Sequence, residues 1–148
     1  MEGYPEPWFI PRAKTILQRL VNQDGFYVVI SSAWRHYLTM DQPAKWFGIP
    51  QEKILGKTPD LWGKVRGGEI EHWLSNAVFE EKIDPKPMLT ILDDESDMLD
   101  WQKPYFVQTE WSIPEDPEAA GLNWEHYQKI MRIIYKHENG YIQMRDLP

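Results

Sequence analysis

The residues best suited to chemistry are two pairs, each placed directly after an apolar, strand-like run. Ser31 and Ser32 form the first pair, and Asp93 and Asp94 form the second. A hydroxyl at the end of a buried strand can hydrogen-bond a phosphate oxygen. Two successive carboxylates there are costly unless water or a cation neutralises them, and Mg²⁺ commonly takes one or two carboxylates. The pattern indicates phosphate binding at the first pair and metal binding at the second.

Three basic residues and one acid extend this set. Arg35 follows the serine pair, Asp97 follows the acid pair, and Lys64 and Arg66 lie in a glycine-punctuated loop at 63–68. A cation just before a helix can neutralise a phosphate while the helix N-terminus adds its dipole. The residues alone leave ordinary alternatives open, because serine pairs also make turns and charged loops are usually solvated.

Strands that alternate with helices are expected to position these residues. The apolar periodicity and the turn signals predict helices beginning at Pro11, Asp41, Glu69 and Asn123, and strands at 26–30, 53–58, 88–92, 105–109 and 141–144. Such alternation implies crossover connections and a parallel sheet. In open α/β sheets the ligand binds at the carboxyl ends of the strands, which singles out the serine pair, the acid pair and the loops behind them.

The composition limits the class of protein. The chain has 148 residues, with 23 Asp and Glu against 16 Lys and Arg, and a net charge of -7. A content of 42% hydrophobic and 14% aromatic residues excludes bulk disorder. The absence of cysteine excludes disulfides and thiolate chemistry, and the four histidines lack metal-ligand spacing. An acidic chain is also a poor default binder of nucleic acid.

We expect a single domain over residues 1–148, because domains cluster around ~100–150 residues. It would consist of a proline-rich arm at 1–10, a core at 11–134 and an extra tail at 135–148. No apolar run approaches the ~18–20 residues that a membrane span needs, and the proline-rich start does not have the pattern of a secretory signal. We therefore expect a cytoplasmic protein without a membrane partner.

Taken in order, these segments resemble haloacid dehalogenase-like (HAD-like) phosphohydrolases, in particular the small HAD domains associated with RNA-repair proteins. The stretch at 26–35, FYVVISSAWR, resembles the second motif of that family, and the stretch at 89–98, LTILDDESDM, resembles its acidic fourth motif. Residues 54–60 and 66–74 are similar to the part between them. The similarity extends from about residue 11 to residue 134.

The resemblance implies a three-layer, Rossmann-like parallel sheet with helices on both faces. It also implies a phosphate site and a metal site. The phosphate-binding residues would be Ser31, Ser32, Arg35, Lys64 and Arg66, and the Mg²⁺ ligands would be Asp93, Asp94 and Asp97. Mg²⁺ would be bound weakly, because part of the family's metal site belongs to a motif that this sequence does not contain.

That motif is the nucleophile sequence Asp-x-Asp at the end of the family's first, central strand, and it does not occur in these 148 residues. The resemblance therefore implies a phosphatase fold that has lost its nucleophile. Such a protein would be catalytically incompetent alone and would bind a phosphate-bearing ligand or a partner. We expect the tail at 141–147 to fill the missing central strand, from this chain or a second copy, and to bring Asp146 near the site.

Two alternatives stay open. The first is an active Mg²⁺-dependent phosphohydrolase, represented here by a fragment or completed by another chain. The second is a PAS-type sensor domain, which residues 37–57 resemble and which would have an antiparallel sheet. The expected macromolecular partner is a second copy or a strand-donating chain, and the expected ligand is a phosphorylated small molecule or a nucleic-acid end.

Overall fold

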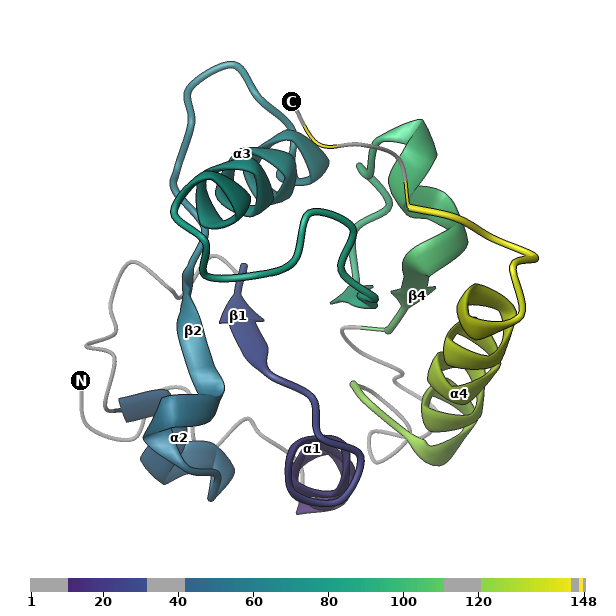
Figure 1. Cartoon of the computed structure of the whole chain (residues 1–148). Helices are drawn as coiled ribbons and strands as arrows, with labels where there is room; N and C mark the ends of the chain where they lie inside the picture. Colours follow the sequence, from purple (N-terminus) through teal and green to yellow (C-terminus); the bar gives the residue numbers. More distant parts are fainter. Residues whose placement is uncertain (1–10, 32–41, 111–120, 145–146, 148) are drawn as a thin grey trace. The chain divides into compact units, whose positions relative to one another are not determined.

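The computed structural model describes residues 11–31, 42–110, 121–144 and 147 (Figure 1). The backbone divides into two compact units. Unit 1 comprises Met1–Lys57 and Glu110–Trp124, and unit 2 comprises Thr58–Thr109 and Glu125–Pro148. Each unit is described by itself. The expectation of one domain over the whole chain, with its arm, core and tail, stays a prediction.

The elements follow the predicted order. Unit 1 contains helix α1 (Pro11–Asn22), strand β1 (Val28–Ile30), helix α2 (Gln42–Phe47), the 3-10 helix η3 (Gln51–Lys53) and strand β2 (Ile54–Lys57). Unit 2 contains helix α3 (Arg66–Phe79), strand β3 (Ile91–Asp93), the 3-10 helix η4 (Asp100–Tyr105), strand β4 (Phe106–Gln108) and helix α4 (Trp124–Glu138), whose first residue is counted with unit 1. Strands therefore alternate with helices, as predicted.

The core of unit 1 forms where α1 and α2 cover the first strand pair. The apolar face of α1 buries Ala13, Ile16, Leu20 and Val21, which recur at helical spacing. Strands β1 and β2 pair in parallel, with Val28 opposite Ile54 and Ile30 opposite Lys57. The cluster that holds this unit together consists of Val21, Ile30, Ala44, Phe47, Ile49 and Ile54.

Strand β1 is shorter than the predicted run at 26–30. The amide of Phe26 donates to the carbonyl of Leu20 at 3.0 Å, so this residue still belongs to the turn that ends α1. That turn passes through Gly25 at φ +79°, a conformation that favours glycine. The predicted stop at Asp24 and Gly25 is therefore confirmed, and the strand begins two residues later than predicted.

The second strand pair, β3 and β4, is also parallel. Ile91 lies opposite Phe106 and Asp93 lies opposite Gln108. The predicted strands at 88–92 and 105–109 were too long at their starts, because Pro104 and Tyr105 belong to η4 and offer no extended partner. There the side chain of Thr90 donates to the Tyr105 carbonyl at 3.2 Å in place of a backbone ladder. The cluster beside this pair consists of Ile70, Leu74, Ile91 and Met98.

The last helix begins after Asn123, as predicted. Its inner face buries His126, Tyr127, Ile130 and Ile133. The helix ends shortly before Gly140, which has φ +76°.

The tail was predicted to form a strand, and residues 141–144 do not form one. The amide of Tyr141 donates to the Lys136 carbonyl at 2.9 Å, so it closes α4 and is not offered to a strand. Leu147 packs against the cluster of unit 2 through its side chain. Asp146 lies outside the described residues.

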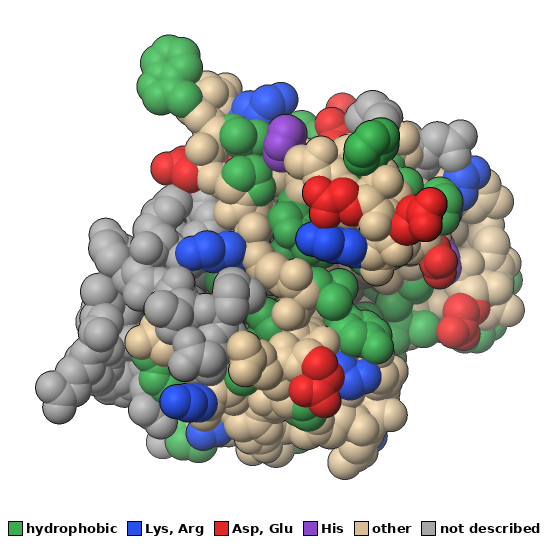
Figure 2. All heavy atoms as spheres, turned by 60° about the vertical axis from the view of Figure 1, so that its left-hand side comes forward, with side chains coloured by type: hydrophobic (Ala, Val, Ile, Leu, Met, Phe, Trp, Pro, Cys, Tyr) green, Lys and Arg blue, Asp and Glu red, His purple; other side chains and the backbone are tan. Residues whose placement is uncertain are grey.

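The surface mixes charges of both signs. Figure 2 shows acidic and basic side chains interspersed with apolar ones on the face in view, without a continuous basic area. Trp62 is fully exposed, at 100%, and Phe79 is exposed at 88%. Among the described residues no helix is both long enough and apolar enough to cross a membrane.

Candidate phosphate site at the end of β3

The centre of the candidate site is an ion pair between α3 and β3. The Nη1 atom of Arg66 donates to the Oδ2 atom of Asp93 at 3.0 Å, and both side chains are largely buried, at 17% and 6% exposure. Asp93 is the last residue of β3, and Arg66 is the first residue of α3. The structure therefore brings together two of the residues that the sequence singled out.

Arg66 occupies its position because Asp97 caps the helix. The backbone amide of Arg66 donates to the Oδ2 atom of Asp97 at 3.0 Å, and the amide of Gly67 donates to the Asp97 carbonyl at 3.2 Å. Helix α3 therefore begins three residues before Glu69, the predicted start. The prediction missed this because the capping residue lies 31 positions further along the chain. The residues predicted as a loop to Gly68 include the first turn of the helix.

Glu69 and Gln102 hold this helix start in place. Glu69, only 5% exposed, accepts from the Leu61 amide at 2.9 Å and faces the Arg66 Nε atom at 3.7 Å. Gln102, at 0% exposure, donates to the Gly67 carbonyl at 2.8 Å and accepts from the Leu99 amide at 2.9 Å. The Arg66 guanidinium is thus positioned by buried, satisfied groups.

The Asp93 carboxyl has an unusual affinity for a proton. Burial raises its pKa from an ordinary value of 3.8 to about 6, and a side-chain hydrogen bond with Asp94 adds to the rise. The amide of Glu95, which donates to the Oδ1 atom at 3.1 Å, and the charge of Arg66 both oppose it. Asp93 therefore takes up a proton at about pH 6, well above the range of an ordinary carboxyl.

The contribution of Asp93 to the free energy of unfolding is expected to fall as the pH rises from about 4 to about 6. The pKa of Asp93 is higher in the folded chain than in the unfolded chain. In this window the folded chain therefore keeps a proton that the unfolded chain has released, and the advantage disappears as the proton leaves. Asp93→Asn should compare more favourably with the parent at about pH 7 than at about pH 4.5, in urea denaturation.

The matched control is Asp84→Asn, which removes one exposed carboxylate from the same unit. An equal stability difference between Asp93→Asn and the parent at both pH values would contradict the prediction.

The acid pair has the chemistry of a magnesium site. A cation would neutralise the adjacent Asp93 and Asp94 carboxylates, and Mg²⁺ sites commonly contain one or two carboxylates. The Oδ1 atom of Asp97 is also buried without a hydrogen-bond partner, so it is an acceptor that a cation could bind. Among the described residues no group of three or more His, Asp or Glu side chains could hold a metal ion. Joint ligation by Asp93, Asp94 and Asp97 stays a prediction.

The remaining predicted phosphate ligands are one lysine, two serines and one arginine. Lys64 is exposed, two positions before α3, and its amide donates to the Leu61 carbonyl at 3.1 Å. Ser31 follows β1 and belongs to unit 1, whereas Arg66 and Asp93 belong to unit 2. Ser32 and Arg35 lie outside the described residues. Their phosphate-binding roles stay predictions.

Three residues of the site had not been singled out for the roles they play. Asp97 was proposed as a metal ligand and is a helix cap, whereas Glu69 and Gln102 were not proposed for any site. An acid in the first turn of a helix was the available signal for Glu69. No local signal points to Gln102, because its partners come from tertiary packing.

The fold and the site together define a class: an α/β protein with parallel strand pairs and an acidic strand end faced by a basic helix start. The family described as "HAD domain in Swiss Army Knife RNA repair proteins" matches residues 1–127. The chain therefore belongs to this family of HAD domains, and the suspected relationship is confirmed. No curated protein and no solved structure was found to match the chain.

Membership of the family implies a Rossmann-like α/β fold, and the two small parallel sheets are consistent with it. The described strands pair in parallel, as the HAD resemblance required, whereas a sensor domain of the PAS type would have an antiparallel sheet. A three-layer arrangement, in which one parallel sheet has helices on both faces, stays a prediction. So does a strand between those that end at Ser31 and Asp93.

Proposed function

We propose that this HAD-like domain binds phosphate-bearing ligands at the end of β3 and does not hydrolyse them by itself. The observation that supports the proposal is the buried Arg66–Asp93 ion pair beside the Asp93–Asp94 carboxyl pair. A guanidinium cation fixed next to two adjacent carboxyls offers both charges that a phosphate and its magnesium ion would use.

Arg66 is the group that would contact the phosphate. A guanidinium has five N–H donors, and Arg66 uses its Nη1 atom for Asp93. The Nη2 atom has no protein partner within the described part of the chain, and the side chain keeps 17% exposure. Asp93 thus fixes the plane of the guanidinium while donors remain for a phosphate oxygen. Lys64 would add a second, solvated positive charge near the N-terminus of α3.

Asp93 and Asp94 are the residues that would hold Mg²⁺. A bound ion would supply positive charge opposite the phosphate oxygens. It would also compete with the proton that Asp93 takes up, so its affinity should weaken below about pH 6. Line broadening of the Asp93 and Asp94 signals by Mn²⁺, measured by NMR, would report this binding independently of activity.

The same proposal excludes turnover by the 148 residues alone. HAD hydrolysis needs an aspartate that attacks phosphorus, and the family's Asp-x-Asp sequence does not occur in these residues. Phosphate ligands would therefore be bound and released unchanged. The alternative is a Mg²⁺-dependent phosphohydrolase that another polypeptide completes with the missing strand. Its support is the presence of the candidate phosphate-binding and metal-binding residues Arg66, Asp93 and Asp94.

The purified chain is expected to release no phosphate from an aryl phosphate in the presence of Mg²⁺. The measurement is continuous absorbance at saturating para-nitrophenyl phosphate, against a sample without protein. Phosphate release by the parent chain that Asp93→Asn abolishes would overturn the proposal in favour of the phosphohydrolase. Release that Asp93→Asn does not change would come from outside this site, and the proposal for the site would stand.

We further propose a cytoplasmic protein whose macromolecular partner is a second copy or a strand-donating chain. The family's central strand carries the Asp-x-Asp sequence, and these residues contain no segment with that sequence. This missing segment is the support for such a partner. An unpaired strand edge is a ready template for another strand. The ligand would be a phosphorylated small molecule or a nucleic-acid end.

A further inference from the structure

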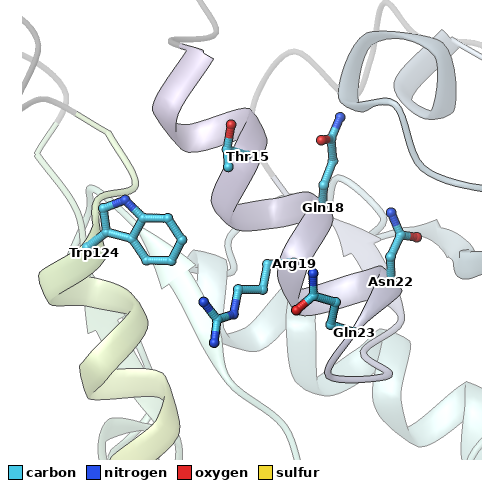
Figure 3. Close-up of a pocket in the computed structure, with 6 residues that line it drawn as sticks. All are labelled: Thr15, Gln18, Arg19, Asn22, Gln23 and Trp124. Atoms are coloured by element: carbon cyan, nitrogen blue, oxygen red, sulfur yellow. The ribbon is translucent and has the colours of Figure 1, made fainter.

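A polar hollow lies in unit 1, and none of its lining residues belongs to the candidate phosphate site. Its volume is about 370 Å³, and it is lined by four residues of α1, by the residue that follows the helix and by Trp124: Thr15, Gln18, Arg19, Asn22, Gln23 and Trp124. Figure 3 shows Trp124 facing α1, with Arg19 and Gln23 side by side near the end of the helix. Pockets for small ligands begin at roughly this size.

Helix α1 presents these residues because its other face is the apolar one. Positions 15, 18, 19, 22 and 23 recur at helical spacing, opposite the buried stripe that includes Ile16 and Leu20. The hollow is therefore a continuous polar stripe with an aromatic ring at one end. It is not a defect of the core.

The lining contains rigid and free groups. The Nε2 atom of Gln18 donates to the Phe47 carbonyl at 2.9 Å, and the Oγ1 atom of Thr15 donates to the Pro11 carbonyl at 3.1 Å. These two side chains form fixed walls. By contrast, the exposed side-chain amides of Asn22 and Gln23 have no hydrogen-bond partner among the described residues. They can donate and accept together.

Trp124 supplies a stacking surface. Its side chain is 40% exposed, and the Cζ atom of Arg19 lies 5.8 Å from its ring centroid, near the outer limit of a cation–π contact. A ligand ring can therefore compete for this surface. None of the six lining residues is acidic, although the chain carries 23 Asp and Glu. The hollow thus offers an indole face, one guanidinium and free amides.

We propose that this hollow binds a purine base, stacked on Trp124 and hydrogen-bonded at its edge by Gln23. Aromatic faces and guanidinium planes are the usual partners of unstacked bases. An amide matches adenine in particular, because adenine presents a donor beside an acceptor on one edge. Arg19 lies where it would contact the base or a phosphate attached to it. The base would belong to a free nucleotide or to a single-stranded nucleic acid. Both would be recognised by the same stacking and hydrogen-bond contacts.

The test is isothermal titration of adenosine 5′-monophosphate, adenosine and a single-stranded oligoadenylate into the full 148-residue chain. Saturable binding of adenosine is expected, with affinity reduced about tenfold or more by Trp124→Ala and retained by Trp124→Phe. The matched control is Trp62→Ala, which removes a fully exposed indole outside the hollow and should leave affinity unchanged.

A second variant protects the test against misfolding. Gln23→Leu removes only an exposed amide and should weaken adenosine binding about threefold or more, with an unchanged circular dichroism spectrum. Tighter binding of the oligomer than of the monophosphate would assign the base to a strand, and the reverse would assign it to a free nucleotide. The proposal is overturned if adenosine does not bind, or if Trp62→Ala weakens binding as much as Trp124→Ala does. It is also overturned if maltose, a sugar that has no base, binds to the hollow instead of adenosine.

Discussion

Replacing Gly67 with alanine is expected to lower the free energy of unfolding by about 2 kcal/mol or more. A Cβ atom at this position would lie 2.6 Å from the Leu99 amide nitrogen and 2.9 Å from the Met98 Cα atom, and it would also meet the Gln102 side chain. The first two atoms are backbone, so they cannot rotate away. The close approach exists because the Gly67 amide donates to the Asp97 carbonyl and the Gly67 carbonyl accepts from the Gln102 side chain.

The neighbouring glycine provides the matched control. A Cβ atom on Gly68 would lie 3.3 Å from the Lys64 Cβ atom, with the remaining close contacts to the flexible part of that side chain. Gly68→Ala should therefore be neutral or stabilising by up to ~1 kcal/mol, since alanine is the better helix former. Urea denaturation of both variants tests the contrast. Equal stabilities of Gly67→Ala and Gly68→Ala would show that α3 does not approach the segment at 98–102 so closely.

Replacing Arg66 with methionine is expected to raise the pKa of Asp93 above about 6, because the guanidinium charge now lowers it. The variant should also lose roughly 2–3 kcal/mol of stability at about pH 8, where a buried carboxylate is left without its cation. The loss should shrink at lower pH, because Asp93 then takes up a proton and the uncompensated charge disappears. Methionine keeps an unbranched side chain of comparable length.

Lys103→Met is the control for this experiment. Lys103 forms an ion pair with Asp100 at 2.9 Å, but the two side chains are 61% and 99% exposed. Water and salt screen an exposed pair, so the control should change stability little. The measurements are denaturation at two pH values and a carboxyl titration of Asp93 by NMR. An unchanged pKa of Asp93 in Arg66→Met would contradict the ion pair.

Much of the fold could be predicted because its signals are local. The stripe of Ile16, Leu20 and Val21 placed α1, and the glycines at 25 and 140 marked two turns. The order of strands and helices followed from apolar runs in the same way. These features depend on residues within one or two helical turns, so a single sequence contains them.

Two of the misplaced boundaries depend on partners distant in the sequence. Helix α3 begins at Arg66 because Asp97 caps it, and the pairing of β3 begins only at Ile91 because η4 occupies the segment before β4. Neither partner is visible in the local pattern of the residue concerned. The start of β1 and the end of α4 depend instead on local turn contacts, of Phe26 with Leu20 and of Tyr141 with Lys136, that the apolar pattern does not indicate.

The candidate site was predicted in its components but not in its arrangement. Asp93 and Arg66 were both singled out, yet as a metal ligand and a phosphate ligand, whereas the structure joins them in an ion pair. Burial then gives Asp93 a raised pKa that its sequence neighbours alone could not indicate. The residues that fix Arg66, namely Asp97, Glu69 and Gln102, follow from packing.

The most direct test of the central claim is a calorimetric titration. Inorganic phosphate is titrated, with Mg²⁺ present, into the parent chain and into Arg66→Met. We expect saturable binding to the parent, affinity reduced about tenfold or more in Arg66→Met, and parent-like affinity in the Lys103→Met control. Absence of binding to the parent, or equal affinity in the parent and Arg66→Met, would contradict a phosphate site at the end of β3.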